Sequence, residues 1–165
     1  MESEDLIRRC TLRHTALTYS HLDFRSQGVG PEPREIQVTV SLGVEHTVAG
    51  LDEDATRLTR FLVEMRGKLR LALQDAPEGA GDTEILSVEA AFRGLYSVSE
   101  GEPVSIDEAQ ALGPWFATQI YPFLSEHINY MLFHTGLSSA AVRIPPALDF
   151  FPATQTPSTQ RDQVS

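Results

Sequence analysis

Apolar and polar residues alternate along three stretches of the chain, which is typical of strands with one face in water. The alternation covers residues 36–44, 58–73 and 85–98, and a less regular stretch runs from about Thr11 to Phe24. Between the two longest stretches lies a Pro/Gly/Asp-rich segment at 75–82, a composition that closes hairpins. The pattern therefore predicts four strands, and it predicts that the two longest pair antiparallel.

The apolar spacing changes to a helical period after the last strand. The residues that recur at this spacing are Phe116, Ile120, Phe123, Leu124, Ile128, Met131 and Leu132. They predict a long helix that ends near Gly136, after a short acidic turn at 107–112. Pro122 lies inside the pattern and predicts a kink or a restart of the helix. The expected fold class is α+β: a four-stranded antiparallel sheet with a long C-terminal-half helix packed on one side.

The chain has 165 residues, of which 41% are hydrophobic, and this suits one core. We expect one domain over residues 1–151 and a disordered polar tail over 152–165, because that tail offers almost no apolar area to bury. The Gly- and Pro-containing segment Gly28–Pro33 predicts a loop that crosses between the first two strands.

The formal net charge is −10, so the average field of the protein repels nucleic acids and anionic lipid surfaces. No apolar run approaches the ~18 residues of a membrane span. The chain starts Met-Glu-Ser-Glu-Asp without a basic or apolar leader, and its single cysteine, Cys10, suits a reducing compartment. We expect a cytoplasmic protein.

Few residues are arranged for catalysis. His127 and His134 lie two helical turns apart, but no further metal ligand is placed by spacing. Cys10 and His14 could in principle form a nucleophile and base, yet nothing in the sequence activates the thiol. The sequence also lacks a phosphate-binding Gly-rich loop and a Gly-x-Ser-x-Gly elbow. We expect no catalysis, no metal and no cofactor.

Large apolar side chains surround the last strand and the helix, and a single sheet with one helix leaves part of them uncovered. Self-association or the binding of another polypeptide would cover this surface. The expected binding residues are Phe92, Leu95, Tyr96, Trp115, Phe116, Tyr121, Phe123 and Met131.

Four strings, in this order and spacing, resemble the SecB family of export chaperones and its SecB-like relatives. They are Ser20-His-Leu-Asp-Phe24, Leu95-Tyr-Ser-Val98, the helix segment 113–128 with its Tyr-Pro-Phe, and Ile144-Pro-Pro-Ala-Leu-Asp-Phe150. The resemblance covers nearly everything from Ser20 to Phe150. It implies an ATP-independent holdase without a cofactor, a homotetramer built as a dimer of dimers, and unfolded polypeptide clients bound in long apolar grooves.

The resemblance also indicates a second surface. In SecB, acidic residues on the solvent face of the sheet bind the export motor SecA, and the matching positions are His21, Arg25 and Glu89. Only Glu89 keeps a negative charge, so we expect weak SecA binding or none. Some SecB-like relatives instead protect the antitoxin of a toxin–antitoxin pair, and the sequence leaves both roles open.

Two other classes of protein are compatible with the same periodicities. A small apolar-ligand carrier would wrap the sheet around the helix, and it predicts a monomer with an internal cavity. An enzyme would need a pair of titratable groups placed for acid–base chemistry, and the sequence shows none.

Overall fold

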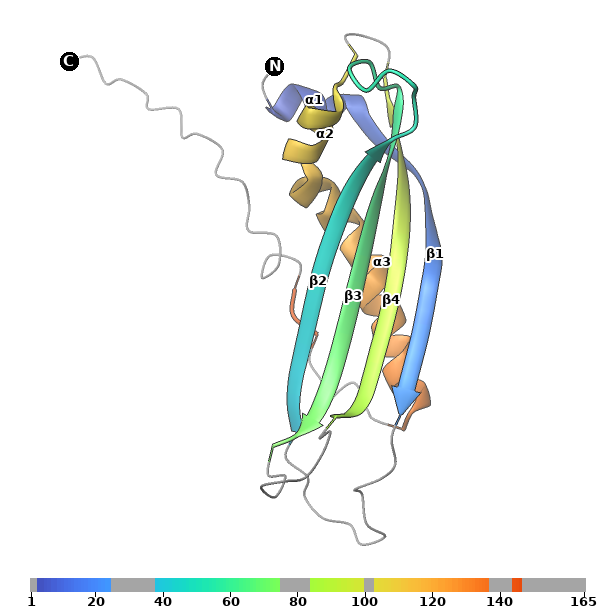
Figure 1. Ribbon diagram of the computed structural model, residues 1–165, viewed down its shortest axis with the longest axis vertical. Helices are drawn as coiled ribbons and strands as arrows, with labels where there is room; N and C mark the ends of the chain where they lie inside the picture. The colour runs from blue at the N-terminus through green and yellow to red at the C-terminus, as the bar shows by residue number, and fades with distance from the viewer. Residues whose placement is uncertain (1–2, 25–37, 75–83, 100–102, 137–143, 147–165) are drawn as a thin grey trace, which may run out of the picture.

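The computed structural model describes residues 3–24, 38–74, 84–99, 103–136 and 144–146. Figure 1 shows one sheet with a long helix across one of its faces. The elements in chain order are α1 (Ser3–Arg9), β1 (Cys10–Phe24), β2 (Val38–Gly50), β3 (Arg60–Leu73), β4 (Glu84–Val98), α2 (Ile106–Ala111) and α3 (Gly113–His134).

The sheet has the strand order β1-β4-β3-β2, and every neighbouring pair is antiparallel. The predicted α+β class is therefore confirmed, as is the predicted antiparallel pairing of the two longest alternating stretches, which form β3 and β4. β1 and β2 form the two edges of the sheet. The predicted turn at 75–82, the crossing loop Gly28–Pro33 and the tail 152–165 lie outside the described residues.

The weaker alternation of β1 has a structural cause. The register between β1 and β4 shifts twice, between Leu12 and His14 and between Leu17 and Tyr19. Each shift exchanges the faces to which the following side chains point. The strand therefore keeps its pairing but loses a regular apolar period.

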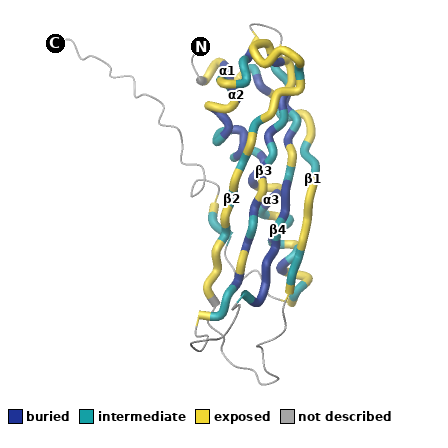
Figure 2. The backbone as a smooth tube through the Cα atoms, viewed as in Figure 1, coloured by how far each residue is buried: buried dark blue, intermediate teal, exposed yellow. Residues whose placement is uncertain are grey.

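The two central strands separate an apolar inner face from a charged outer face. On β3 the inner residues are buried and the outward ones include Arg66, Lys68 and Arg70. Figure 2 shows buried residues concentrated along β3 and β4, with more exposure on the edge strands. The inner face therefore supplies the sheet's half of the core.

Helix α3 crosses the inner face diagonally and very close to the backbone. Its first residue, Gly113, approaches His46 and Val48 of β2, and its later residue His127 bonds Ser20 of β1. Glycines make this approach possible, because a Cβ at Gly67 would lie 2.8 Å from Leu124 Cδ2. At Gly94 a Cβ would likewise lie 2.7 Å from Ile120 Cδ1.

The centre of the core is aromatic. The rings of Phe61 and Tyr96 stack at a centroid distance of 5.2 Å, and Phe116 of α3 packs on both. The Tyr96 hydroxyl donates to the Phe116 backbone carbonyl at 2.9 Å, which satisfies a buried polar group. Sheet and helix are thus joined by both apolar packing and a buried hydrogen bond.

Two local predictions need correction. The helix does not restart at Pro122, since α3 is continuous from Gly113 to His134. Pro122 is exposed, so water can replace the backbone donor that proline lacks. The predicted acidic turn is the helix α2, whose start is fixed by a capping box between Ser105 and Glu108.

The packing of α3 on the sheet predicts a clear contrast between two leucines. Leu124→Ala should lower the free energy of unfolding by about 2–5 kcal/mol, because Leu124 is 0% exposed and lies over Gly67. The control Leu51→Ala, at a residue 44% exposed, should cost less than about 1 kcal/mol. Denaturant unfolding measures both, and equal effects would contradict this packing.

Candidate functional site

Five side chains form an aromatic strip along one side of α3. Phe123, His127, Tyr130 and His134 follow each other on α3, and Phe92 reaches them from β4. Ring centroids lie 6.4 Å apart for Phe92 and Phe123, 5.8 Å for Phe92 and His127, and 4.4 Å for Tyr130 and His134. Phe123 is 40% exposed and Tyr130 is 58% exposed. We call this set the lateral strip, and it presents apolar ring surface to solvent.

The edge strand β1 borders the lateral strip. The Ser20 hydroxyl is 2.8 Å from His127 Nε2 and 4.0 Å from the sulfur of Met131. Leu17, which pairs with Phe92 in the sheet, is also exposed. The apolar surface therefore continues from the helix onto the edge of the sheet.

Two further aromatic residues lie on the side of α3 opposite Leu124. Trp115 and Phe133 stand respectively nine residues before and after Leu124, which is about two and a half helical turns. Phe133 is 71% exposed, whereas Trp115 is partly covered and packs edge-on against Phe116. We call Trp115 and Phe133 the helix back.

Four of the eight residues predicted to bind another polypeptide lie on these surfaces. Phe92 and Phe123 belong to the lateral strip, Met131 borders it, and Trp115 lies on the helix back. The structure therefore brings three of the four together beside β1.

The other four lie outside these surfaces. Tyr96 and Phe116 are buried in the core. Tyr121 is also buried, and its hydroxyl donates to the carbonyl of Pro145. Leu95 faces the outer side of the sheet, because its neighbour Tyr96 faces α3. The apolar character of a residue therefore does not by itself show whether it lies in the core or on the surface.

The lateral strip also contains His127, Tyr130 and His134, which the sequence did not single out as binding residues. Their spacing from Phe123 follows one side of a helix, and this was the available signal. Within the described ranges, no three His, Cys, Asp or Glu residues are grouped to hold a metal ion. The two histidines instead contribute rings to the strip.

Cys10 and His14 do not form a catalytic pair. Cys10 is buried on the inner face of the sheet, whereas His14 is exposed and pairs with the outward residue Leu95. Burial raises the pKa of the Cys10 thiol to about 11, which disfavours the nucleophilic thiolate.

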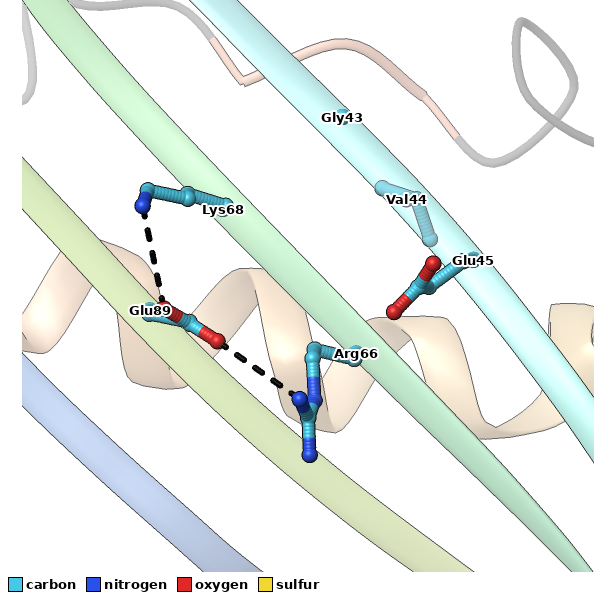
Figure 3. Close-up of a pocket in the computed structure, with 6 residues that line it drawn as sticks. All are labelled: Gly43, Val44, Glu45, Arg66, Lys68 and Glu89. Atoms are coloured by element: carbon cyan, nitrogen blue, oxygen red, sulfur yellow. Dashed lines mark ion pairs between the residues drawn. The ribbon is translucent and has the colours of Figure 1, made fainter.

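The outer face of the sheet carries a charge network around Glu89. Its carboxylate lies 3.8 Å from Arg66 and 3.9 Å from Lys68, as Figure 3 shows, and His21 is its neighbour on β1. Arg25, the third residue predicted on this surface, lies outside the described residues. Glu89 is therefore already engaged by two cations of the same sheet.

A hollow of about 400 Å³ lies beside this network. It is lined by Gly43, Val44, Glu45, Arg66, Lys68 and Glu89 (Figure 3). This lining is largely charged, unlike the internal apolar cavity that a small-ligand carrier would need. The close contacts of α3 with Gly67 and Gly94 also leave no room for such a ligand at those points.

Comparison with known proteins identifies the fold. No protein-family model matches the sequence, and no curated protein does. The structure is similar to the Mycobacterium tuberculosis Rv1957 SecB-like chaperone, solved in complex with a ChAD peptide from the Rv1956 HigA1 antitoxin. The match has a TM-score of 0.55 and 19% sequence identity, and it covers 87% of this chain and 91% of that chain. The protein therefore has a SecB-like fold.

In the part of the chain that the structure describes, no helix is both long enough and apolar enough to cross a membrane.

The histidines predict a pH dependence of stability. Burial lowers the pKa of His127 and His46 in the folded state, so the unfolded chain binds protons first as the pH falls through about 6.5. The melting temperature should therefore fall between pH 7.5 and pH 5.5. His127→Gln should reduce this fall. Thermal denaturation at the two pH values measures this, and an identical fall in the His127→Gln variant would contradict the prediction.

Proposed function

We propose that the protein is a chaperone that holds unfolded polypeptides without nucleotide and without a catalytic step. The observation that carries the proposal is the exposed lateral strip beside the edge strand β1. Soluble proteins seldom leave several neighbouring aromatic rings in water unless a partner covers them. The exposed rings offer apolar contact to an extended apolar segment of a client.

The charge of α3 supports a client that is recognised by apolar contact. Between Gly113 and His134 the only Asp, Glu, Lys or Arg residue is Glu126. Binding at the lateral strip should therefore change little as salt is added, because salt screens charges and not apolar contact. Such contact also makes little demand on the sequence of the client.

Two client roles are consistent with this surface, protection of an antitoxin and protein export. The Rv1957 protein was solved with an antitoxin peptide, which favours an antitoxin as the partner proposed for this chain. For export, the proposed SecA-type surface is His21, Arg25 and Glu89. The engagement of Glu89 by Arg66 and Lys68 supports weak SecA binding, since the carboxylate is already paired. We propose that the protein acts in the cytoplasm, where either client would be made.

The helix back supports self-association. Phe133 points away from the sheet of its own chain, so a second copy is a natural cover for it and for Trp115. We propose a homotetramer in which the helix backs pack together. The lateral strips then stay open to clients.

The holding activity should depend on the lateral strip. In a light-scattering assay with a denatured client and no nucleotide, the wild-type protein should suppress aggregation at stoichiometric amounts. The double variant Phe123→Ser/Tyr130→Ser should need about tenfold more protein, because two aromatic contacts of roughly 0.7 kcal/mol each are lost. Glu89→Lys on the outer face is the control and should retain wild-type activity. No suppression by the wild-type protein, or equal activity of the double variant, would contradict the proposal.

The oligomer should depend on the helix back. Size-exclusion chromatography with light scattering should give a tetramer at micromolar concentration. Phe133→Glu should shift it to smaller species, since a charge would be buried without a partner. Thr47→Glu, at an exposed position of the outer face, should leave the tetramer intact. A wild-type monomer at this concentration would rule the assembly out.

A further inference from the structure

A short segment of the chain itself lies against α3 on the side opposite the lateral strip. This segment is Ile144–Pro146, which we call the strap, and Figure 1 shows it on the β2 side of the molecule. Ile144 is half-buried and packs against the hydrophobic core. The carbonyl of Pro145 accepts a hydrogen bond from the Tyr121 hydroxyl.

The position of the strap follows from the path of α3. The helix starts over β2, at His46 and Val48, and reaches β1 at Ser20. Two opposite corners of the inner face are therefore not covered by α3. The lateral strip lies where α3 reaches β1, and the strap lies on the side of the uncovered β2 corner, where Val40 remains exposed.

The contacts of the strap are those that an unfolded client would make. An isoleucine contributes apolar area, and the two prolines favour an extended backbone that needs no partner strand. Tyr121 recognises a backbone carbonyl, a group that every polypeptide has. The contact therefore recognises the backbone and the apolar area of an extended segment, and it does not depend on one particular sequence.

We infer that the Tyr121 side of α3 is a second binding groove for extended apolar polypeptide, and that the strap occupies it as a built-in competitor. The inference rests on the proposed chaperone function. It also explains why Tyr121, which the sequence predicted as a client-binding residue, is buried: a segment of its own chain covers it. A client must displace the strap to reach this groove.

Tethering makes the strap an effective competitor. Ile144 follows the end of α3 at His134 by only ten residues, and short linkers give effective concentrations in the millimolar range. A free segment at micromolar concentration competes poorly with it. The apparent affinity for a free segment is proportional to the fraction of molecules whose groove is open. Weakening the strap increases this fraction and should therefore raise that affinity.

The test uses a fluorescent peptide with the sequence of residues 142–150, Val-Arg-Ile-Pro-Pro-Ala-Leu-Asp-Phe, and the full-length protein. Ile144→Asp should loosen the strap, and the peptide should then bind at least about fivefold more tightly than to the wild-type protein. Ile144→Ser is a milder second variant in case aspartate disturbs folding, and circular dichroism checks both. A control peptide with aspartate in place of its isoleucine should bind neither variant.

Adding Tyr121→Phe to the Ile144→Asp variant should weaken peptide binding by about threefold or more, because one hydrogen bond to the peptide backbone is lost. Equal peptide affinity for the wild-type protein and both Ile144 variants would overturn the inference. This result is distinct from failure of the proposed function, which is read from the aggregation assay with the wild-type protein. The peptide-binding assay therefore tests the inference, and the aggregation assay tests the proposed function.

Discussion

The arrangement depends on how closely α3 approaches the sheet. Gly67 and Gly94 leave space that Leu124 and Ile120 fill, and Gly113 lets the first turn of the helix meet His46. Larger residues at these points would hold the helix away from the strands and open the aromatic core between them. Close contact at several points also fixes the diagonal path of α3, because each contact lies on a different strand.

The diagonal path determines which surfaces are available for binding. A helix parallel to the strands would divide the inner face into two similar sides, whereas a diagonal helix leaves two opposite corners. The lateral strip, with Phe123 and Tyr130 exposed, lies where α3 reaches β1, and the uncovered corner at β2 lies beside Ile144–Pro146. The outer face has a different chemistry, since Glu64 and Glu89 pair with cations of neighbouring strands. Apolar recognition and surface charge are thus separated by the sheet.

Much of the fold could be predicted from the sequence, because strand alternation and helical spacing both report which residues face a core. The parts of the structure that could not be predicted also have physical causes. The alternation predicts β1 less clearly, because two register shifts interrupt it. The sequence pattern did not lead to a prediction of α1, although Glu4 and Arg8 suit the two ends of a helix. Tyr96 and Phe123 are both large aromatic residues, and only the three-dimensional packing shows that the first is buried and the second exposed. The sequence therefore predicts an aromatic binding surface, but it does not show which aromatic residues form it.

The central claim is that clients contact the lateral strip and not the outer face of the sheet. Site-specific photo-crosslinking tests it most directly, with a photoreactive phenylalanine analogue at position 130 in one protein and at position 47 in another. Tyr130 lies on the strip, whereas Thr47 is exposed on the outer face. The account predicts that a denatured client is crosslinked from position 130 and not from position 47. Crosslinking from position 47 alone, or equally from both positions, would contradict it.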